Sequence, residues 1–410
     1  MAEKRSGNPL ASSVSFRRVS ARARMVLPLW ATLAGAALML ALACGGSSGG
    51  SASPTSGRPD TGVPSPAGNP PVGNGVAPGG AKTTRSMPAP GNPAGTAAIP
   101  AAAQAEDVSH PTTVVGTGTP ESCTPAALEA AIHKGGVVTF NGGPDPITIT
   151  LDHTIKIINN AGASQNGDLV IDGGGKVTLS GGERCRILYQ NGCDAAQVYI
   201  TDHCQDYPHP RLVLQNLILA DGYATDGGIM GGGALFVESG SLKLVNCVFV
   251  NNQCALTGRD VAGGAVYAFM VQGPVYITNC TFGGVEGMGN RGSHGGALGT
   301  IGVSYTILNS RFSWNRATGT GMNGGNPGGG NGGAIYNDGN TYTLDIQGCD
   351  FSNNAANELA GAVFYVSNDS SGALKVDHST FHVNSGKDVQ SVKGFYIQAG
   401  SQSFTTCTFD

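Results

Sequence analysis

The feature that most constrains the fold of this chain is a short pattern that recurs about every thirty residues between Gly232 and Phe409. Each copy starts with Gly-Gly-Ala or Gly-Ala and an aliphatic residue, followed in most copies by an aromatic residue. The copies start at Gly232, Gly263, Gly295, Gly332 and Gly361. Such a period indicates a solenoid or a propeller, because one unit cannot bury its own apolar face and must stack on a neighbour.

Each copy continues as an alternating apolar run that ends in Cys or Ser, one further residue and then Phe. These are Phe249, Phe282, Phe312, Phe351, Phe381 and Phe409, and Asn follows three residues later in four copies, at Asn252, Asn315, Asn354 and Asn384. Alternation with a period of two predicts strands, and no helix-length pattern separates them. The spacing between Phe residues varies from 28 to 39, which suits loop insertions better than propeller blades. We therefore predict an all-β fold, a right-handed single-stranded parallel β-helix, which is a solenoid.

One short helix is expected ahead of the repeats. Thr124 is suited to the N-cap, Pro125 to the first turn and Gly135 to the position after the end of a helix that runs to Lys134. Several strand-like segments follow before the first repeat. The helix is therefore predicted to cap the N-terminal end of the β-helix.

Residues 1–43 are predicted to be an export signal. Six Lys or Arg residues precede a nearly uncharged apolar run over residues 25–43. The small residues before Cys44 resemble a bacterial lipoprotein cleavage site, which implies a lipid on Cys44 and a location at the outer membrane or cell surface. Ala41 stands where such sites prefer Leu. Cleavage with secretion, or an uncleaved anchor that spans the bilayer, therefore remains an alternative.

Composition divides the rest of the chain into two parts. Residues 44–107 are rich in Gly, Pro, Ser and Ala and are predicted to be a flexible tether, whereas residues 108–410 are predicted to form one β-helix domain. Residues 1–43 contain six of the 23 Lys and Arg residues and one of the 27 Asp and Glu residues, so the remaining chain has a net charge of −9. This charge, without a basic cluster, argues against nucleic acid as a partner.

The helix, the run from Val170 to Gly175 (Val-Ile-Asp-Gly-Gly-Gly) and the repeated Gly-Gly-Ala and Phe-x-x-Asn units together resemble pectin-lyase-like β-helix proteins of bacterial surfaces. The repeat itself is similar to that of the chlamydial polymorphic outer-membrane proteins. The resemblance covers about residues 123–410. Proteins of this kind include polysaccharide lyases and adhesins, so the resemblance is more specific for fold than for function.

The ten cysteines of an exported chain suggest an oxidising compartment. Three of them lie in an irregular polar excursion and are the expected disulfide formers: Cys185, Cys193 and Cys204. Four occupy the same position of the repeat and are expected to be small buried residues: Cys247, Cys280, Cys349 and Cys407. No Cys/His pair has zinc-ligand spacing, and no metal site is predicted.

Catalysis is the alternative function. In β-helix lyases, carboxylates on neighbouring turns hold calcium and a basic residue removes a proton from a uronate. Alignment of the repeats brings Asp345, Lys375 and Asp377 together on the outer surface, which makes them weak candidates for a polysaccharide lyase or glycoside hydrolase site. A solvated salt bridge is the competing explanation. No cofactor is predicted, and calcium would be expected only for a lyase.

A binding surface is the favoured prediction. The residue after the inward aliphatic position of each repeat should point outward, and four of these residues are aromatic: Phe236, Tyr267, Tyr336 and Phe364, interrupted by Gly299. Such a stripe can stack on sugar rings, although packing beneath their own loops would explain the aromatic residues equally well. We predict an envelope-tethered protein with a recognition, adhesion or structural role towards a polysaccharide or another cell-surface ligand.

Overall fold

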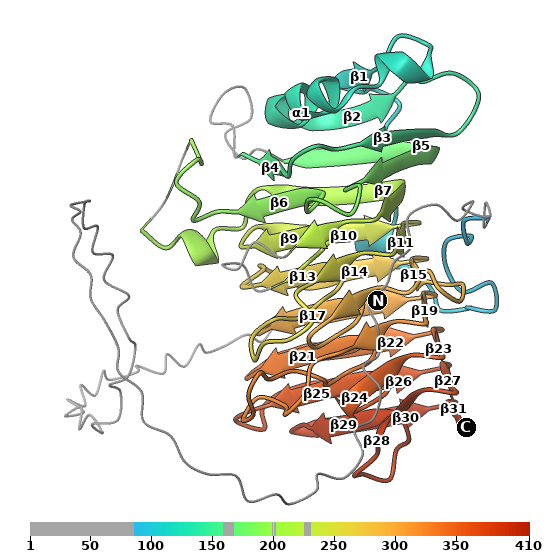
Figure 1. The fold of residues 1–410 in the computed structure, drawn as a ribbon, viewed down its shortest axis with the longest axis vertical. Coiled ribbons are helices and arrows are strands. Elements are labelled where there is room, and N and C mark those ends of the chain that lie inside the picture. Colours follow the sequence, from blue (N-terminus) through green and yellow to red (C-terminus); the bar gives the residue numbers. More distant parts are fainter. Residues whose placement is uncertain (1–85, 159–167, 199, 201, 225–230) are drawn as a thin grey trace, which may run out of the picture. The chain divides into compact units, whose positions relative to one another are not determined.

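The computed structural model describes residues 86–158, 168–198, 200, 202–224 and 231–410. The predicted export signal, Cys44 and the first part of the predicted tether lie outside these residues. Secondary structure in the described part is dominated by strands (Figure 1). The helices are α1 (Pro125–Lys134) and three short 3₁₀ helices, η1 (Ala101–Ala103), η2 (Pro120–Ser122) and η3 (Cys204–Asp206). None of the described helices is long and apolar enough to cross a bilayer.

The strands form three sheets in which every pairing between named strands is parallel. The first sheet contains β1 (Thr113–Val115), β2 (Gly136–Phe140), β3 (Ile147–Thr150), β5 (Leu169–Ser180), β7 (Arg211–Ala220), β10 (Ser241–Val245), β11 (Val248–Val250), β14 (Val275–Thr278), β15 (Thr281–Gly283), β18 (Tyr305–Leu308), β19 (Arg311–Ser313), β22 (Thr343–Gln347), β23 (Asp350–Ser352), β26 (Ala373–Asp377), β27 (Thr380–His382), β30 (Ser401–Thr405) and β31 (Thr408–Phe409). The second sheet contains β4 (Ile155–Ile157), β6 (Leu188–Asn191), β9 (Leu235–Glu238), β13 (Val266–Phe269), β17 (Leu298–Ile301), β21 (Ile335–Gly339), β25 (Val363–Ser367) and β29 (Phe395–Gln398). The third sheet contains β8 (Tyr223–Ala224), β12 (Gln253–Cys254), β16 (Arg291–Gly292), β20 (Arg316–Ala317), β24 (Ala355–Leu359) and β28 (Ser385–Lys387).

Each strand of a repeat pairs with the corresponding strand of the next repeat, so equivalent residues form rows. The inward row of the first sheet pairs Leu244 with Ile277 and Ile277 with Ile307, as the alignment of the repeats predicted. The predicted Phe column is also present and buried. Its rings stack at centroid distances of 4.7 Å from Phe249 to Phe351, and 4.8 Å to Phe381. These rows form the continuous apolar core between the sheets.

A ladder of asparagines lies beside the Phe column. The Oδ1 atom of Asn315 accepts hydrogen bonds from the backbone N–H and the side-chain amide of Asn290, at 3.1 and 2.9 Å. Asn315 in turn donates to Asn354 in the same way. Sequence alignment missed Asn290, because an insertion after Phe282 moves it from the third to the eighth position beyond the Phe. The ladder satisfies polar groups that would otherwise be buried without partners.

The corner between successive strands of the first sheet is two residues long in the regular repeats, and its first residue has a positive φ. Asn246, Asn279 and Asn309 have φ values of 52°, 50° and 49°, a left-handed conformation that Asn tolerates better than most residues. Asn279 also donates to Asn246, and Asn246 to Asn216, through their side-chain amides. The corner therefore closes tightly in the regular repeats.

Helix α1 has the predicted ends. The hydroxyl of Thr124 accepts a hydrogen bond from the backbone N–H of Ala127 at 3.2 Å, Pro125 occupies the first turn, and Gly135 follows with a φ of +73°. Leu128 and Ile132 are buried. The helix therefore packs its apolar side on the core of the first strands.

Residues 86–107 correct the predicted extent of the flexible tether, because they pack against the first sheet (blue in Figure 1). The side chain of Asn309 pairs with both backbone groups of Ala97, at 2.8 and 2.9 Å. The side chain of Gln215 pairs in the same way with Glu106, at 2.8 and 3.0 Å. These amide pairs recognise the backbone alone, so a segment of Pro, Ala and Gly can be ordered without an apolar pattern.

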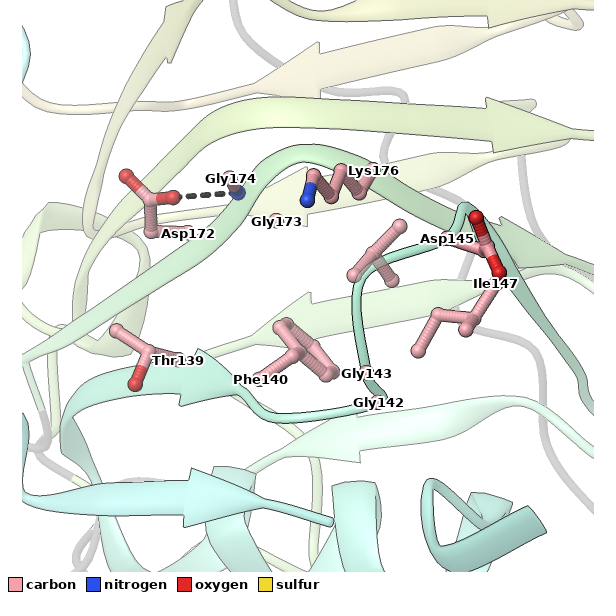
Figure 2. A pocket seen from close by; sticks show the side chains of 11 residues that line it. Thr139, Phe140, Gly142, Gly143, Asp145, Ile147, Asp172, Gly173, Gly174 and Lys176 are labelled. Carbon is pink, nitrogen blue, oxygen red and sulfur yellow. Dashed lines mark hydrogen bonds between the residues drawn. The ribbon is translucent and has the colours of Figure 1, made fainter. Parts of the chain in front are cut away.

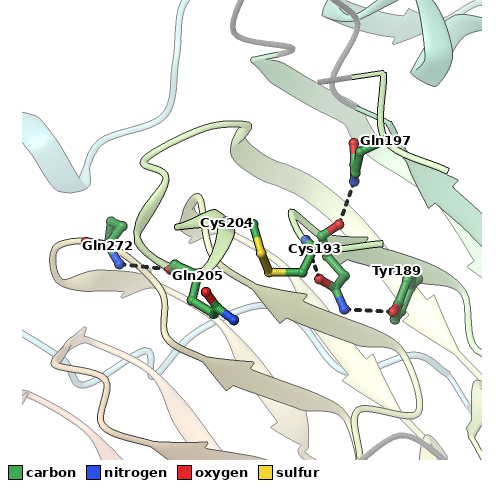
Figure 3. Close-up of a disulfide and its surroundings, with 7 residues drawn as sticks. Tyr189, Cys193, Gln197, Cys204, Gln205 and Gln272 are labelled. Carbon is green, nitrogen blue, oxygen red and sulfur yellow. Dashed lines mark hydrogen bonds between the residues drawn. A yellow bond between two sulfur atoms is a disulfide. The ribbon is translucent and has the colours of Figure 1, made fainter. Parts of the chain in front are cut away.

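The polar excursion between β6 and β7 contains one disulfide, Cys193–Cys204 (Figure 3). This confirms two of the three expected disulfide formers, whereas Cys185 is a free thiol. Gln272 ties the excursion to a neighbouring repeat by donating to the backbone oxygen of Gln205 at 3.2 Å. The column cysteines Cys247, Cys280 and Cys349 are free and fully buried, and Cys407 is free and half-buried.

Candidate functional site

The predicted aromatic residues form a column on the outer side of the second sheet. Phe236 stacks on Tyr267 at a centroid distance of 5.8 Å, and Tyr336 stacks on Phe364 at 5.1 Å. The column also contains Tyr189 and Tyr396, which stack on Phe236 and Phe364 at 5.2 and 4.9 Å. The sequence pattern missed these two rings, because neither follows a complete Gly-Gly-Ala step.

The predicted interruption at Gly299 is occupied by other groups. Gly299 pairs with Tyr267 on one side and Tyr336 on the other, and a Cβ atom on Gly299 would lie only 2.4 Å from the Cβ atom of Ala262. The ring of His294 packs on Tyr336 instead, with centroids 4.4 Å apart. The column is therefore continued by an imidazole rather than being left open.

His294 is completely buried in this column. Its Nδ1 atom accepts the backbone N–H of Asn331 at 3.2 Å, which places the proton of a neutral ring on Nε2. Burial lowers the pKa of His294 to about 4, since the charged ring would lose its hydration. His294 is thus a neutral packing residue at pH 7.

The accessibility of the aromatic column corrects the predicted sugar-stacking stripe. Phe236, Tyr267, Tyr336 and Phe364 are only 2%, 0%, 4% and 5% exposed. Rings this deeply buried cannot present a face to a sugar over the length of the sheet. The competing explanation, aromatic residues packed beneath their own loops, accounts for most of the column.

The exception is a groove at the C-terminal end of the column, with a volume of about 290 Å³. Phe364 and Val366 form its apolar floor, and Tyr396 contributes a half-buried ring. Met322 and Asn323, from the Gly-rich loop of residues 318–331, also line the groove. A partly enclosed aromatic floor with polar walls is the usual arrangement of a small-ligand site.

The polar wall of the groove is a connected hydrogen-bond network. The hydroxyl of Tyr336 donates to Asp338 Oδ2 at 3.0 Å and accepts from Asn323 at 2.8 Å. Asn368 donates to Asp338 Oδ1 at 2.9 Å. Burial, together with the carboxylate of Asp338, raises the pKa of Tyr336 far above its usual value, so its hydroxyl keeps its proton. The network fixes the wall but leaves lone pairs on Asp338 and one N–H on Asn323 for a ligand.

The loop of residues 318–331 is held over the column by its own contacts. Two antiparallel bridges join Thr320 to Gly328 and Met322 to Gly329. Near the tip, Glu358 accepts the N–H of Gly321 at 3.0 Å and forms an ion pair with Lys387. The hydrogen bond from Lys387, and secondly that from Gly321, lowers the pKa of Glu358. Glu358, which stabilises the groove wall, therefore stays charged at pH values somewhat below the ordinary pKa of a glutamate.

The weak catalytic candidates lie elsewhere, on the outer side of the first sheet. Asp345 pairs with Lys375 in adjacent strands, and Gln347 pairs with Asp377, as predicted. The carboxylates have other partners: Asp345 accepts from Gln347 at 3.1 Å, and Asp377 lies 2.8 Å from His378. Within the described chain, the ion pairs do not include one between Lys375 and either aspartate. The register brings the three residues together without joining them into a charge network.

No group of three or more His, Cys, Asp or Glu side chains in the described part of the chain is arranged to hold a metal ion. Comparison with known proteins gives no further constraint on function: no family model, no curated protein and no solved structure matches this chain.

Proposed function

We infer that the three sheets are the faces of a right-handed single-stranded parallel β-helix and that α1 caps its first turn. The parallel pairing of every strand with its counterpart in the next repeat supports this. Continuous rows of Phe, Asn and aliphatic residues in the interior support it as well. Such a scaffold holds surface loops at fixed distances along one axis.

We propose that the protein recognises carbohydrate, and that the groove beside Tyr396 is the binding site. The main support is the combination of a half-buried aromatic ring with planar amide and carboxylate groups already fixed by hydrogen bonds. An aromatic face packs on the C–H face of a sugar ring. Asp338 accepts hydrogen bonds from hydroxyl groups, and Asn323 can donate one to a hydroxyl oxygen. Little ordering is then required on binding, which favours affinity.

The same groove lacks the groups that cleavage would require. Canonical glycoside hydrolysis uses two carboxyl groups on either side of the scissile bond, whereas Asp338 is the only acidic residue among the described groove-lining residues. Proton abstraction by a lyase requires a base and a cation beside the uronate, and no Lys, Arg or His lines the described groove. The groove therefore favours recognition over catalysis.

We further propose that this recognition takes place at the cell envelope, with the protein held there by a lipid on Cys44. The basic and apolar character of residues 1–43 supports export, and the small residues before Cys44 support lipid attachment. An adhesive or structural role towards a polysaccharide fits such a location.

Glycan-array screening of the purified protein, followed by calorimetry with the best ligand, tests the proposed site. Tyr396→Ala should weaken binding about two- to tenfold, since aromatic packing beyond area burial contributes about 0.5–1.5 kcal/mol. Tyr276→Ala is the matched control, because Tyr276 is also a half-buried tyrosine but lies on the first sheet. Absence of binding to any glycan, or an equal loss in both variants, would contradict the proposal.

A further inference from the structure

A second hollow lies where the first repeats depart from the regular corner. In the later repeats, the corner of the first sheet is two residues long and begins with a left-handed residue such as Asn279. Between β2 and β3 it is instead the six-residue segment 141–146, and β5 contains an irregularity between Asp172 and Val177. Because β2 and β3 both pair with β5, these two long corners are neighbours. They enclose a hollow of about 280 Å³ (Figure 2).

The floor of this hollow is an aromatic ring that the neighbouring repeat leaves uncovered. The pairing of β2 with β5 ends at Val138 and Ile171, and just beyond it Phe140 and Gly173 both line the hollow. A Cβ atom on Gly173 would lie 2.6 Å from the backbone oxygen of Asn216, so only glycine fits there. Figure 2 shows the ring of Phe140 within the hollow, between Thr139 and the 142–143 turn. Phe140 is half-buried and presents its remaining surface to the hollow.

The walls of the hollow present fixed acceptors and a fixed donor. Asp172 is only 7% exposed, and its carboxylate accepts from the N–H of Gly174, from Gln215 and from Asn216 at 2.6–2.9 Å. Across the hollow, the ammonium group of Lys176 donates to the backbone oxygen of Pro144 at 2.7 Å. This bond joins the two long corners. Asp172 and Lys176 are therefore held in place before any ligand binds, and the exposed Asp145 of the 141–146 corner also lines the hollow.

We propose that this hollow binds one sugar residue, with a ring face on Phe140 and hydroxyl groups on Asp172, Asp145 and Lys176. A polyhydroxylated ring can donate to the carboxylates and accept from the ammonium group. An anion would meet two carboxylates, and a cation would meet the ammonium group, so a neutral ligand suits the mixed charges best. The volume matches a single ring rather than an oligosaccharide.

This inference takes its ligand class from the proposed function but uses different residues on a different sheet. A chain with both sites would bind two sugar residues at once, one in the groove beside Tyr396 and one in the hollow. Two separate sites on one body increase avidity for a surface that displays many copies of the same glycan.

The number of binding sites per chain, measured by calorimetry with the glycan selected on the array, tests the inference. The purified protein should bind two equivalents. Phe140→Leu keeps an aliphatic contact with the core but removes the ring. In this variant the affinity of the hollow should fall at least tenfold, so that one equivalent still binds, in the other groove. Lys176→Met should do the same. Lys134→Met is the matched control, since Lys134 is an exposed lysine that also donates to a backbone oxygen, that of Thr112.

Each possible result distinguishes the two sites. One equivalent that is lost in Tyr396→Ala and unchanged in Phe140→Leu overturns the second site and leaves the proposed function intact. One equivalent that is lost in Phe140→Leu and unchanged in Tyr396→Ala overturns the groove and supports the hollow. Retained melting temperatures establish that a loss of binding is local. Loss of binding in Lys134→Met to the same extent as in Lys176→Met would also overturn the assignment.

Discussion

The buried imidazole of His294 makes the stability of this protein depend on pH in a specific window. Its pKa is about 4 in the folded protein, against an ordinary value of 6.5. Between these two values the unfolded chain binds a proton that the folded chain does not bind, so stability falls as the pH is lowered. The full difference of about 2.5 pKa units corresponds to roughly 3 kcal/mol. At pH 5, most of the proton uptake by the unfolded chain is complete, and the expected loss is about 2 kcal/mol.

His294→Phe tests this reasoning because it keeps a ring on Tyr336 but removes the titrating group. The variant leaves the N–H of Asn331 without its acceptor, which should cost about 1–3 kcal/mol at every pH. His294→Gln is the companion variant, since its side-chain oxygen can accept that N–H and it does not titrate. Both variants should therefore lose less stability than the native protein between pH 7.5 and pH 5, whatever their stability at pH 7.5.

Urea denaturation followed by circular dichroism at pH 7.5, 6.5, 5.5 and 5 measures the difference. Other titrating groups are common to all three proteins, so their effects cancel in the comparison. The free energy of unfolding of the native protein should fall by about 2 kcal/mol more than that of each variant over this range. Curves that stay parallel would refute the assignment of a depressed pKa to His294.

Three further predictions concern the core, the N-terminal segment and the location of the protein. Phe312→Ala should lower the free energy of unfolding by about 3–5 kcal/mol in urea denaturation, because Phe312 is fully buried between two stacked rings. Phe404, a half-buried residue of the last repeat, is the control. A loss no larger than that of Phe404→Ala would contradict the prediction. Asn309→Ala removes both hydrogen bonds to Ala97 and should accelerate hydrogen exchange in residues 92–97 by at least tenfold, whereas Asn246→Ala should leave that segment unchanged. Cys44→Ser should move the protein from the membrane fraction to the soluble fraction, and persistence in the membrane fraction would exclude the lipid as the anchor.

The rows of equivalent residues could be predicted from the sequence, because every repeat contains the same local pattern and this pattern aligns it with the next repeat. Phe282 and Phe312 occupy the same place relative to a local Gly-Gly-Ala step, so their pairing required no knowledge of the rest of the chain. Asn290 was missed for the same reason, since an insertion breaks the spacing on which the alignment depends. Helix α1 was predicted to within one residue because its Thr, Pro and Gly each act within one turn.

The accessibility of the aromatic column could not be predicted in this way. Strand alternation gives the side of the sheet on which Tyr336 lies, but burial depends on what the loops cover. The loop of residues 318–331 lacks an apolar pattern, and its position is set by Glu358 and Arg259 from other repeats. The order of residues 86–107 was missed for a similar reason. Their partners, Gln215 and Asn309, recognise only backbone groups, which every sequence possesses.

Both proposed sites lie where the repeat is broken, and this follows from how the repeat is stabilised. In the regular part, Asn315 and its neighbours bond to each other, the Phe rings stack on each other, and the corner residues close the gap between strands. Side chains satisfied in this way have no donors, acceptors or ring faces left for a ligand. The loop of residues 318–331 and the irregular part of β5 after Asp172 interrupt these rows. Tyr396, Phe140 and Lys176 remain at least partly exposed there, in a rigid setting. In a fold of this kind, departures from the repeat are therefore where recognition is to be expected.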